Sequence, residues 1–140
     1  MKNFVLITLL FATVFFSFDG LKNSEGINFK NVSFEEALEM ADTEGKYIFV
    51  DAYAEWCGPC KWMEKNTFKN PKVGRLFNKH FINLKIDMEK GEGTELARKY
   101  RVTQYPTMMI INSEGEVVKR IIGAKNETAL IEAVQNHLQP

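Results

Sequence analysis

The stretch that most constrains this chain is Trp56-Cys57-Gly58-Pro59-Cys60-Lys61, which follows a largely apolar run at residues 47–53 and contains both cysteines. An apolar run of this kind is typical of a central strand covered on both faces. Pro59 suits the first turn of a helix, because it lacks an amide N–H and its φ is pre-set. Gly58 lets another chain come close. The stretch therefore predicts a strand-to-helix corner that carries a dithiol.

The spacing of the two cysteines indicates a redox-active pair that opens and closes a disulfide. At a helix N-terminus Cys57 faces unpaired backbone N–H groups and the positive end of the helix dipole. These stabilise its thiolate, so we expect Cys57 to be the nucleophile. Cys60, one turn later, is expected to lie deeper and to resolve a mixed disulfide.

Three other interpretations of the pair fit the sequence less well. A structural disulfide closing so short a loop would restrain the unfolded chain little. A structural zinc site needs four ligands, and the other soft donors, His80 and His137, stand alone rather than at ligand spacing. Inert buried thiols fit worst, because Gly-Pro would break an element that holds them. The redox interpretation is favoured.

The stretch from Phe49 to Lys61 resembles the active-site segment of thioredoxin, and Tyr105-Pro106-Thr107 resembles its cis-proline loop. The resemblance runs from about Ser33 to the C-terminus. Residues 64–73 are more similar to the thioredoxin-like proteins grouped with the C-terminal periplasmic domain of the transmembrane reductase DsbD. The resemblance implies an α/β thioredoxin fold, with a central mixed β-sheet flanked by helices on both faces.

Asp51 places a carboxylate within the otherwise apolar run, where burial of a charge is costly. The resemblance implies a carboxyl of raised pKa that relays a proton for Cys60. The alternative is an aspartate at a strand end that reaches solvent. Lys85 occupies the position of the thioredoxin lysine near this carboxyl, and either tunes Asp51 or points outward as an ordinary lysine.

The resemblance makes Pro106 a cis-proline opposite the dithiol and lets Tyr105 touch the substrate. The alternatives are a trans proline at an edge strand and a surface aromatic. Trp56 is expected to cover the disulfide and to offer an apolar rim for docking, or to be a packing residue. With Gly58 and Pro59, these residues form the predicted substrate-positioning set.

The composition limits the classes of function that this chain can have. A length of 140 residues with 45% hydrophobic residues suits one domain with an ample core. Lys and Arg total 18, as do Asp and Glu, so no basic excess exists to attract nucleic acid. Neither a metal ion nor an organic cofactor is implied.

Residues 1–18 are far more apolar than the rest of the chain. Residues 1–18 contain Lys2 followed by a run rich in Phe and Leu, which is typical of a signal peptide. The run is shorter than the ~20 residues that span a bilayer, so cleavage is favoured, although an uncleaved N-terminal anchor is the alternative. We therefore predict a signal at 1–18, a linker with a first short strand at 19–30, and a thioredoxin-like domain at 31–140.

Local signals predict the order β-α-β-α-β-α-β-β-α. Ser33 and Glu36 form a capping box for a helix that ends near Gly45. Helices are also expected at 57–66, from Pro71, at 95–100 and after Asn126. Further strands are expected around 27–29 and at 47–53, 81–87, 107–111 and 116–122.

Together these features predict an exported thiol–disulfide oxidoreductase, periplasmic or secreted, that reduces disulfide-containing exported proteins. By resemblance its electron donor would be a membrane-embedded reductase, and membrane contact would require that residues 1–18 be retained. A disulfide oxidase or isomerase is the alternative within the same chemistry, although the Gly-Pro pair is the one found in reducing thioredoxins. A non-catalytic binding module is the alternative from another class.

Overall fold

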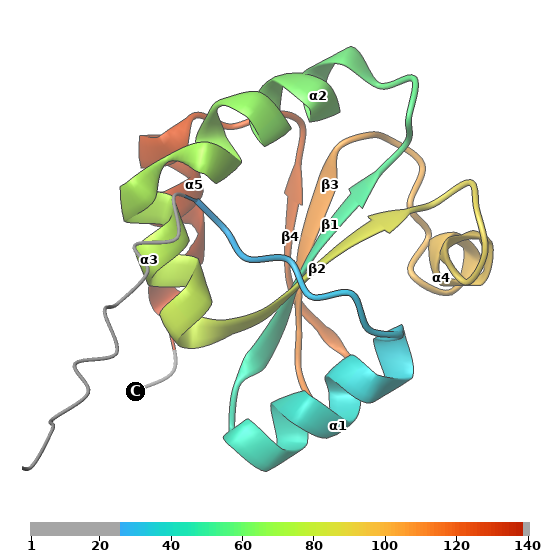
Figure 1. The fold of residues 1–140 in the computed structure, drawn as a ribbon. Coiled ribbons are helices and arrows are strands. Elements are labelled where there is room, and N and C mark those ends of the chain that lie inside the picture. Colours follow the sequence, from blue (N-terminus) through green and yellow to red (C-terminus); the bar gives the residue numbers. More distant parts are fainter. Residues whose placement is uncertain (1–25, 139–140) are drawn as a thin grey trace, which may run out of the picture.

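The computed structural model describes residues 26–138 (Figure 1). The signal predicted at residues 1–18 and most of the linker lie outside the described residues. No helix within 26–138 has the length and apolar character needed to cross a membrane.

The centre of the fold is a four-stranded mixed sheet in the order β2-β1-β3-β4. β1 (Tyr47–Tyr53) pairs in parallel with β2 (Phe81–Asp87) and antiparallel with β3 (Thr107–Ile111). β4 (Val117–Ile122) pairs antiparallel with β3 and lies at the edge of the sheet. β1 is thus flanked on both sides, which confirms the central strand predicted from its apolar run.

Helix α1 (Phe34–Glu44) has the capping box predicted from the sequence, because the Ser33 side chain accepts from the Glu36 amide and the Glu36 carboxylate accepts from the Ser33 amide. It ends at Gly45, whose φ of 62° is left-handed, a conformation that glycine adopts without strain. The predicted bounds of this helix are confirmed.

The two helices after the cysteines also begin close to the predicted residues. α2 (Gly58–Lys65) is followed by the 3₁₀ turn η1 (Thr67–Lys69), and α3 (Pro71–His80) begins at the proline. Asn70 caps α3 through its side chain. α4 (Gly93–Lys99) begins two residues earlier than predicted, and α5 (Glu127–Val134) is capped by Asn126, with the short turn η2 (Gln135–His137) after it.

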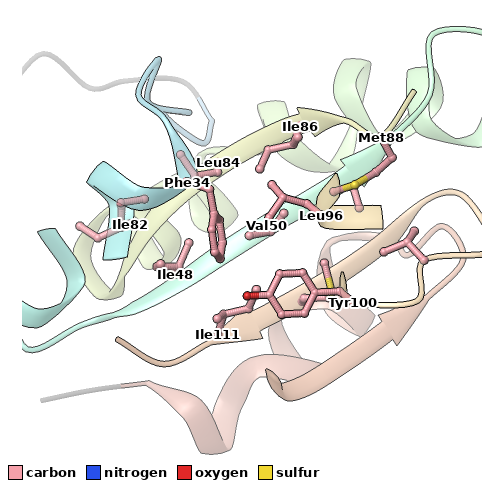
Figure 2. Packing of buried hydrophobic residues seen from close by; sticks show 14 of the residues in the cluster. Phe34, Ile48, Val50, Ile82, Leu84, Ile86, Met88, Leu96, Tyr100 and Ile111 are labelled. Atoms are coloured by element: carbon pink, nitrogen blue, oxygen red, sulfur yellow. The ribbon is translucent and has the colours of Figure 1, made fainter. Parts of the chain in front are cut away.

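The sheet separates two hydrophobic cores. On one face α1 and α4 pack on the sheet; there the Phe34 ring meets Tyr100 edge-on at 5.7 Å, beside Val50 and Ile111 (Figure 2). On the other face α2, α3 and α5 cover the sheet (Figure 1). At the centre of this second core the Phe49 ring contacts Phe77 at 4.7 Å.

The first strand predicted around residues 27–29 is wrong. The backbone there makes isolated hydrogen bonds, from Ile27 to the Phe68 carbonyl and from Lys30 to the Asn83 carbonyl. The Asn28 amide bonds to the Asn78 side chain instead of to a strand. Because these residues form no continuous ladder with any strand of the described chain, the segment lies against the fold without extending the sheet.

Candidate active site

The two cysteines form a disulfide, and they lie where the chain enters α2 after β1. The carboxyl end of β1 leads into the start of α2 (Figure 1). Cys57 is the N-cap of α2, and its sulfur accepts the amide N–H of Cys60 at 3.1 Å. The local sequence explains this geometry, since Pro59 occupies the first turn and leaves Cys57 beside unpaired amides. A negative charge on the Cys57 sulfur would therefore be stabilised.

Burial of the pair differs from the prediction. Cys60 was expected to lie deeper, but Cys57 is 2% exposed and Cys60 is 3% exposed. The reason is that Tyr53, Ala54 and Tyr105 pack around both residues. The two cysteines are therefore buried to nearly the same extent.

The approach to the disulfide is open on the helix side. Gly58 and Pro59 are both exposed. A Cβ added to Gly58 would meet no atom of residues 26–138 within 4 Å. A second polypeptide can therefore bring its backbone close to this turn, as the sequence predicted for Gly58.

Two aromatic side chains form the rim of the site. Trp56 is 67% exposed, and its indole N–H donates to the Glu89 carboxylate at 3.0 and 3.1 Å. The Trp56 ring meets the Tyr105 ring edge-on, with 5.8 Å between centroids. Tyr105 precedes Pro106, and the bond between them is cis. The structure therefore brings Trp56, the predicted rim residue, into contact with Tyr105, the predicted substrate contact, and Tyr105 packs against the disulfide residues.

Asp51 lies within β1 and is 1% exposed. Neither of its carboxylate oxygens has a hydrogen-bond partner within the described residues. Burial raises the pKa of this carboxyl from 3.8 to about 7, against a lowering by the positive charge of Lys85. The alternative of a carboxylate that reaches solvent is therefore excluded.

Lys85 pairs with Asp51 in the parallel register of β1 and β2. Its ammonium, however, lies 2.7 Å from the Glu64 carboxylate and 4.6 Å from the centre of the Tyr53 ring. Lys85 is thus held by Glu64 and still acts on Asp51 at longer range, since its charge lowers the pKa of Asp51. Lys85 therefore tunes Asp51 through its charge, as the first interpretation expects. Its ammonium, however, is held by Glu64 and not by the Asp51 carboxylate.

Glu64 and Glu89 are the residues that the sequence analysis did not assign to the site. Glu64 lies one helical turn after Cys60, and the two residues line the same pocket of about 220 Å³ with Lys85. The four-residue spacing from Cys60 places Glu64 on the same face of α2, so the sequence pattern could have predicted its position at the site. Glu89 approaches Trp56 from the loop after β2, and no local pattern indicates that contact.

The described part of the chain holds no cluster of three or more His, Cys, Asp or Glu side chains suited to a metal ion. Both cysteines are engaged in the disulfide. The chemistry that the arrangement offers is thiol–disulfide exchange, with a sulfur at a helix N-terminus and a buried carboxyl of raised pKa on the strand that leads to it.

Comparisons with known proteins agree with this geometry. A family model described as thioredoxin-like matches residues 28–113. The thiol:disulfide interchange protein DsbD of Yersinia pestis is 31% identical over 115 residues, which cover 79% of this chain and 19% of that protein. The chain thus spans about a fifth of the length of the curated relatives it matches.

Solved structures of thioredoxin-like proteins are also similar to this chain. A candidate disulphide-isomerase from Bacteroides thetaiotaomicron is 52% identical, with a TM-score of 0.72 over 80% of this chain and 93% of that one. The oxidised C-terminal domain of DsbD from Neisseria meningitidis has a TM-score of 0.63 at 22% identity, over 79% of this chain and 98% of that one, and shows similarity of fold.

Proposed function

The chain belongs to the thioredoxin-like family, and from that premise we propose that it is a thiol–disulfide oxidoreductase that works as a reductase of exported proteins. The observation that supports this most strongly is the position of the Cys57 sulfur. It caps α2 and accepts the Cys60 amide N–H, so the thiolate form of Cys57 is favoured once the disulfide is reduced.

The proposed reaction has two exchange steps. The Cys57 thiolate attacks one sulfur of a substrate disulfide, the substrate S–S bond breaks, and the other substrate sulfur leaves as a thiolate. Cys60, after losing its proton, attacks the Cys57 sulfur of this mixed disulfide. The remaining substrate sulfur leaves as a thiolate, and Cys57–Cys60 is left oxidised. Two electrons pass from the dithiol to the substrate.

Asp51 is proposed to take the proton from Cys60 in the second step. Its buried carboxyl has a pKa of about 7, so it can both accept and give up a proton near neutral pH. Tyr105 and Pro106, with Trp56, Gly58 and Pro59, are proposed to position the substrate, since they border the disulfide or its open approach.

The cycle needs a source of electrons to reduce Cys57–Cys60 again. We propose a membrane-embedded reductase as donor and disulfide-containing exported proteins as substrates. The similarity to DsbD supports partners of this type. The signal predicted at residues 1–18 and the predicted domain from residue 31 support export to the periplasm or beyond, or attachment to the membrane by that segment.

A second candidate function is disulfide isomerisation, which the similarity to the Bacteroides protein favours. The equilibrium reduction potential of the Cys57–Cys60 couple separates the two. A value near the roughly −270 mV typical of thioredoxin would support the reductase. A value of about −120 to −180 mV would refute it and favour an oxidase or isomerase.

The binding-module alternative is tested by turnover. The protein should reduce the disulfides of insulin faster than dithiothreitol alone. Wild-type rates equal to that background would contradict an enzymatic role. A Cys57→Ser variant serves as the matched control, because it removes the proposed nucleophile.

A further inference from the structure

A pocket of about 450 Å³ lies next to the active-site rim. It is bordered by the end of α4, by the loop that leads to Pro106, and by β4. Three cations from these segments line it, Lys99, Arg101 and Arg120, and no acidic residue of the described part of the chain does. The pocket is therefore basic, although the whole chain has no net charge.

The three cations differ in their surroundings, because Lys99 also lines a neighbouring pocket with Glu35, Glu92 and Glu95. No ion pair joins any of them to a carboxylate within residues 26–138. Lys99 lies over the rings of Phe34 and Tyr100, and Arg120 donates to the Tyr100 carbonyl at 2.7 Å. These contacts hold two of the side chains at the pocket and leave their charges available.

Arg101 follows the C-cap of α4, where the amides of Arg101 and Val102 bond to carbonyls of the last helical turn. Its φ of 51° is left-handed, and it is the non-glycine residue with positive φ in the described part of the chain. Glycine is favoured there, because a Cβ is strained in this conformation. The side chain nevertheless makes no hydrogen bond or ion pair within residues 26–138. The left-handed φ belongs to the termination of α4, and the exposed guanidinium is available to an external partner.

The pocket shares its wall with the proposed substrate-binding loop. Thr103, Gln104 and Thr107 line it and flank Tyr105 and Pro106. The Thr107 hydroxyl donates to the Gln104 carbonyl at 2.7 Å, which holds the two ends of this loop together. Since Tyr105 packs against the disulfide residues, a polypeptide docked there lies immediately beside the pocket.

We propose that this basic pocket binds an acidic stretch of the polypeptide whose disulfide the chain exchanges. The inference rests on the proposed function and adds to it a substrate class, proteins with Asp or Glu near the reacting cysteine. Arginine is suited to this task, because its planar guanidinium binds a carboxylate through two parallel hydrogen bonds. Glu89, on the Trp56 side of the rim, would repel the same stretch and so orient the substrate.

The test uses two synthetic disulfide peptides that differ only in flanking the disulfide on both sides with Glu or with Gln. The readout is the ratio of kcat/KM for the Glu peptide to kcat/KM for the Gln peptide, with dithiothreitol as electron source. The wild-type ratio should exceed one and should fall as salt is added. A preference of about fivefold corresponds to one moderately strong ion pair.

Arg101→Asn should bring the ratio close to one, and Arg101→Asp should bring it below one. Both replacements tolerate the left-handed backbone, so folding is preserved. Arg75→Gln is the matched control, because it removes one positive charge from an exposed position on α3, on the opposite face of the sheet. This control should keep the wild-type ratio.

Three results would overturn the inference. Equal turnover of both peptides by the wild type would refute the pocket's role and leave the proposed function intact. No turnover of either peptide above the dithiothreitol background would refute the proposed function, and the inference with it. Binding to vesicles of anionic phospholipid that requires Arg101, without any preference between the peptides, would assign the pocket to a membrane surface instead.

Discussion

Replacing Asp51 with asparagine should make the oxidised protein more stable at neutral and alkaline pH. The carboxyl is 1% exposed, and neither of its oxygens has a hydrogen-bond partner within residues 26–138. Burial raises its pKa from 3.8 to about 7. An ionised Asp51 is therefore costly in the folded state and well solvated in the unfolded one. Asparagine has nearly the same shape and carries no charge.

The sign and size of the change in the free energy of unfolding with pH follow from proton linkage. Between pH 3.8 and about 7 the unfolded chain has lost the Asp51 proton while the folded chain still holds it. The free energy of unfolding therefore falls as pH rises through this window and levels off above it. One pKa unit corresponds to about 1.36 kcal/mol, so the shift amounts to about 4 kcal/mol at most. Asp51→Asn removes this pH-dependent fall in the free energy of unfolding, because asparagine does not ionise.

The assay is urea denaturation of the oxidised wild type and variant at about pH 4 and about pH 8.5, with the free energy of unfolding extrapolated to water. The gain from Asp51→Asn should be several kcal/mol larger at the higher pH. Asp42→Asn, at an exposed position of α1, is the control and should show no such dependence. A gain that is equal at both pH values, or a loss at high pH, would refute an unpaired buried carboxyl.

The other predictions concern the exchange reaction, the charge next to Asp51, and the core. Cys60→Ser should accumulate mixed disulfides between Cys57 and its substrates, seen as dithiothreitol-sensitive bands on non-reducing gels; complete absence of adducts would contradict the two-step mechanism. Glu64→Gln should lower the pKa of Asp51, because it removes a nearby negative charge and frees the Lys85 ammonium that Glu64 now holds at 2.7 Å. NMR titration of the Asp51 carboxyl checks this, and an unchanged or higher pKa would count against it. Phe49→Ala should cost about 3 to 5 kcal/mol of stability, because its ring is fully buried. Urea denaturation measures the cost, and a loss below about 1 kcal/mol would mean that the second core collapses around the vacancy.

Features set by neighbours in the sequence were predicted well. The bounds of β1, β2 and β3 are those expected from their apolar runs. The capping box at Ser33 and the helix start at Pro71 are also confirmed. In each case the deciding interaction joins residues a few positions apart, so the local pattern contains the information needed.

Predictions that depended on packing were less complete. The strand expected around residues 27–29 fails, because its amides find isolated acceptors in η1, α3 and β2. Cys60 is not deeper than Cys57, because Tyr105, from a loop distant in sequence, covers both. The cis bond before Pro106 is confirmed, but the resemblance to thioredoxin supplied that prediction, not the proline itself.

By itself the sequence determined the order of the elements from α1 onward, the placing of the dithiol at the start of a helix, and the presence of a carboxyl within a central strand. These follow from local sterics, capping and hydrophobic periodicity. Only the tertiary structure decided which partner holds Lys85, that both oxygens of Asp51 find no partner among residues 26–138, and that Lys99, Arg101 and Arg120 gather in one pocket. Such contacts depend on which distant segments the sheet and its helices bring together, because charges and rings interact through space and not along the chain.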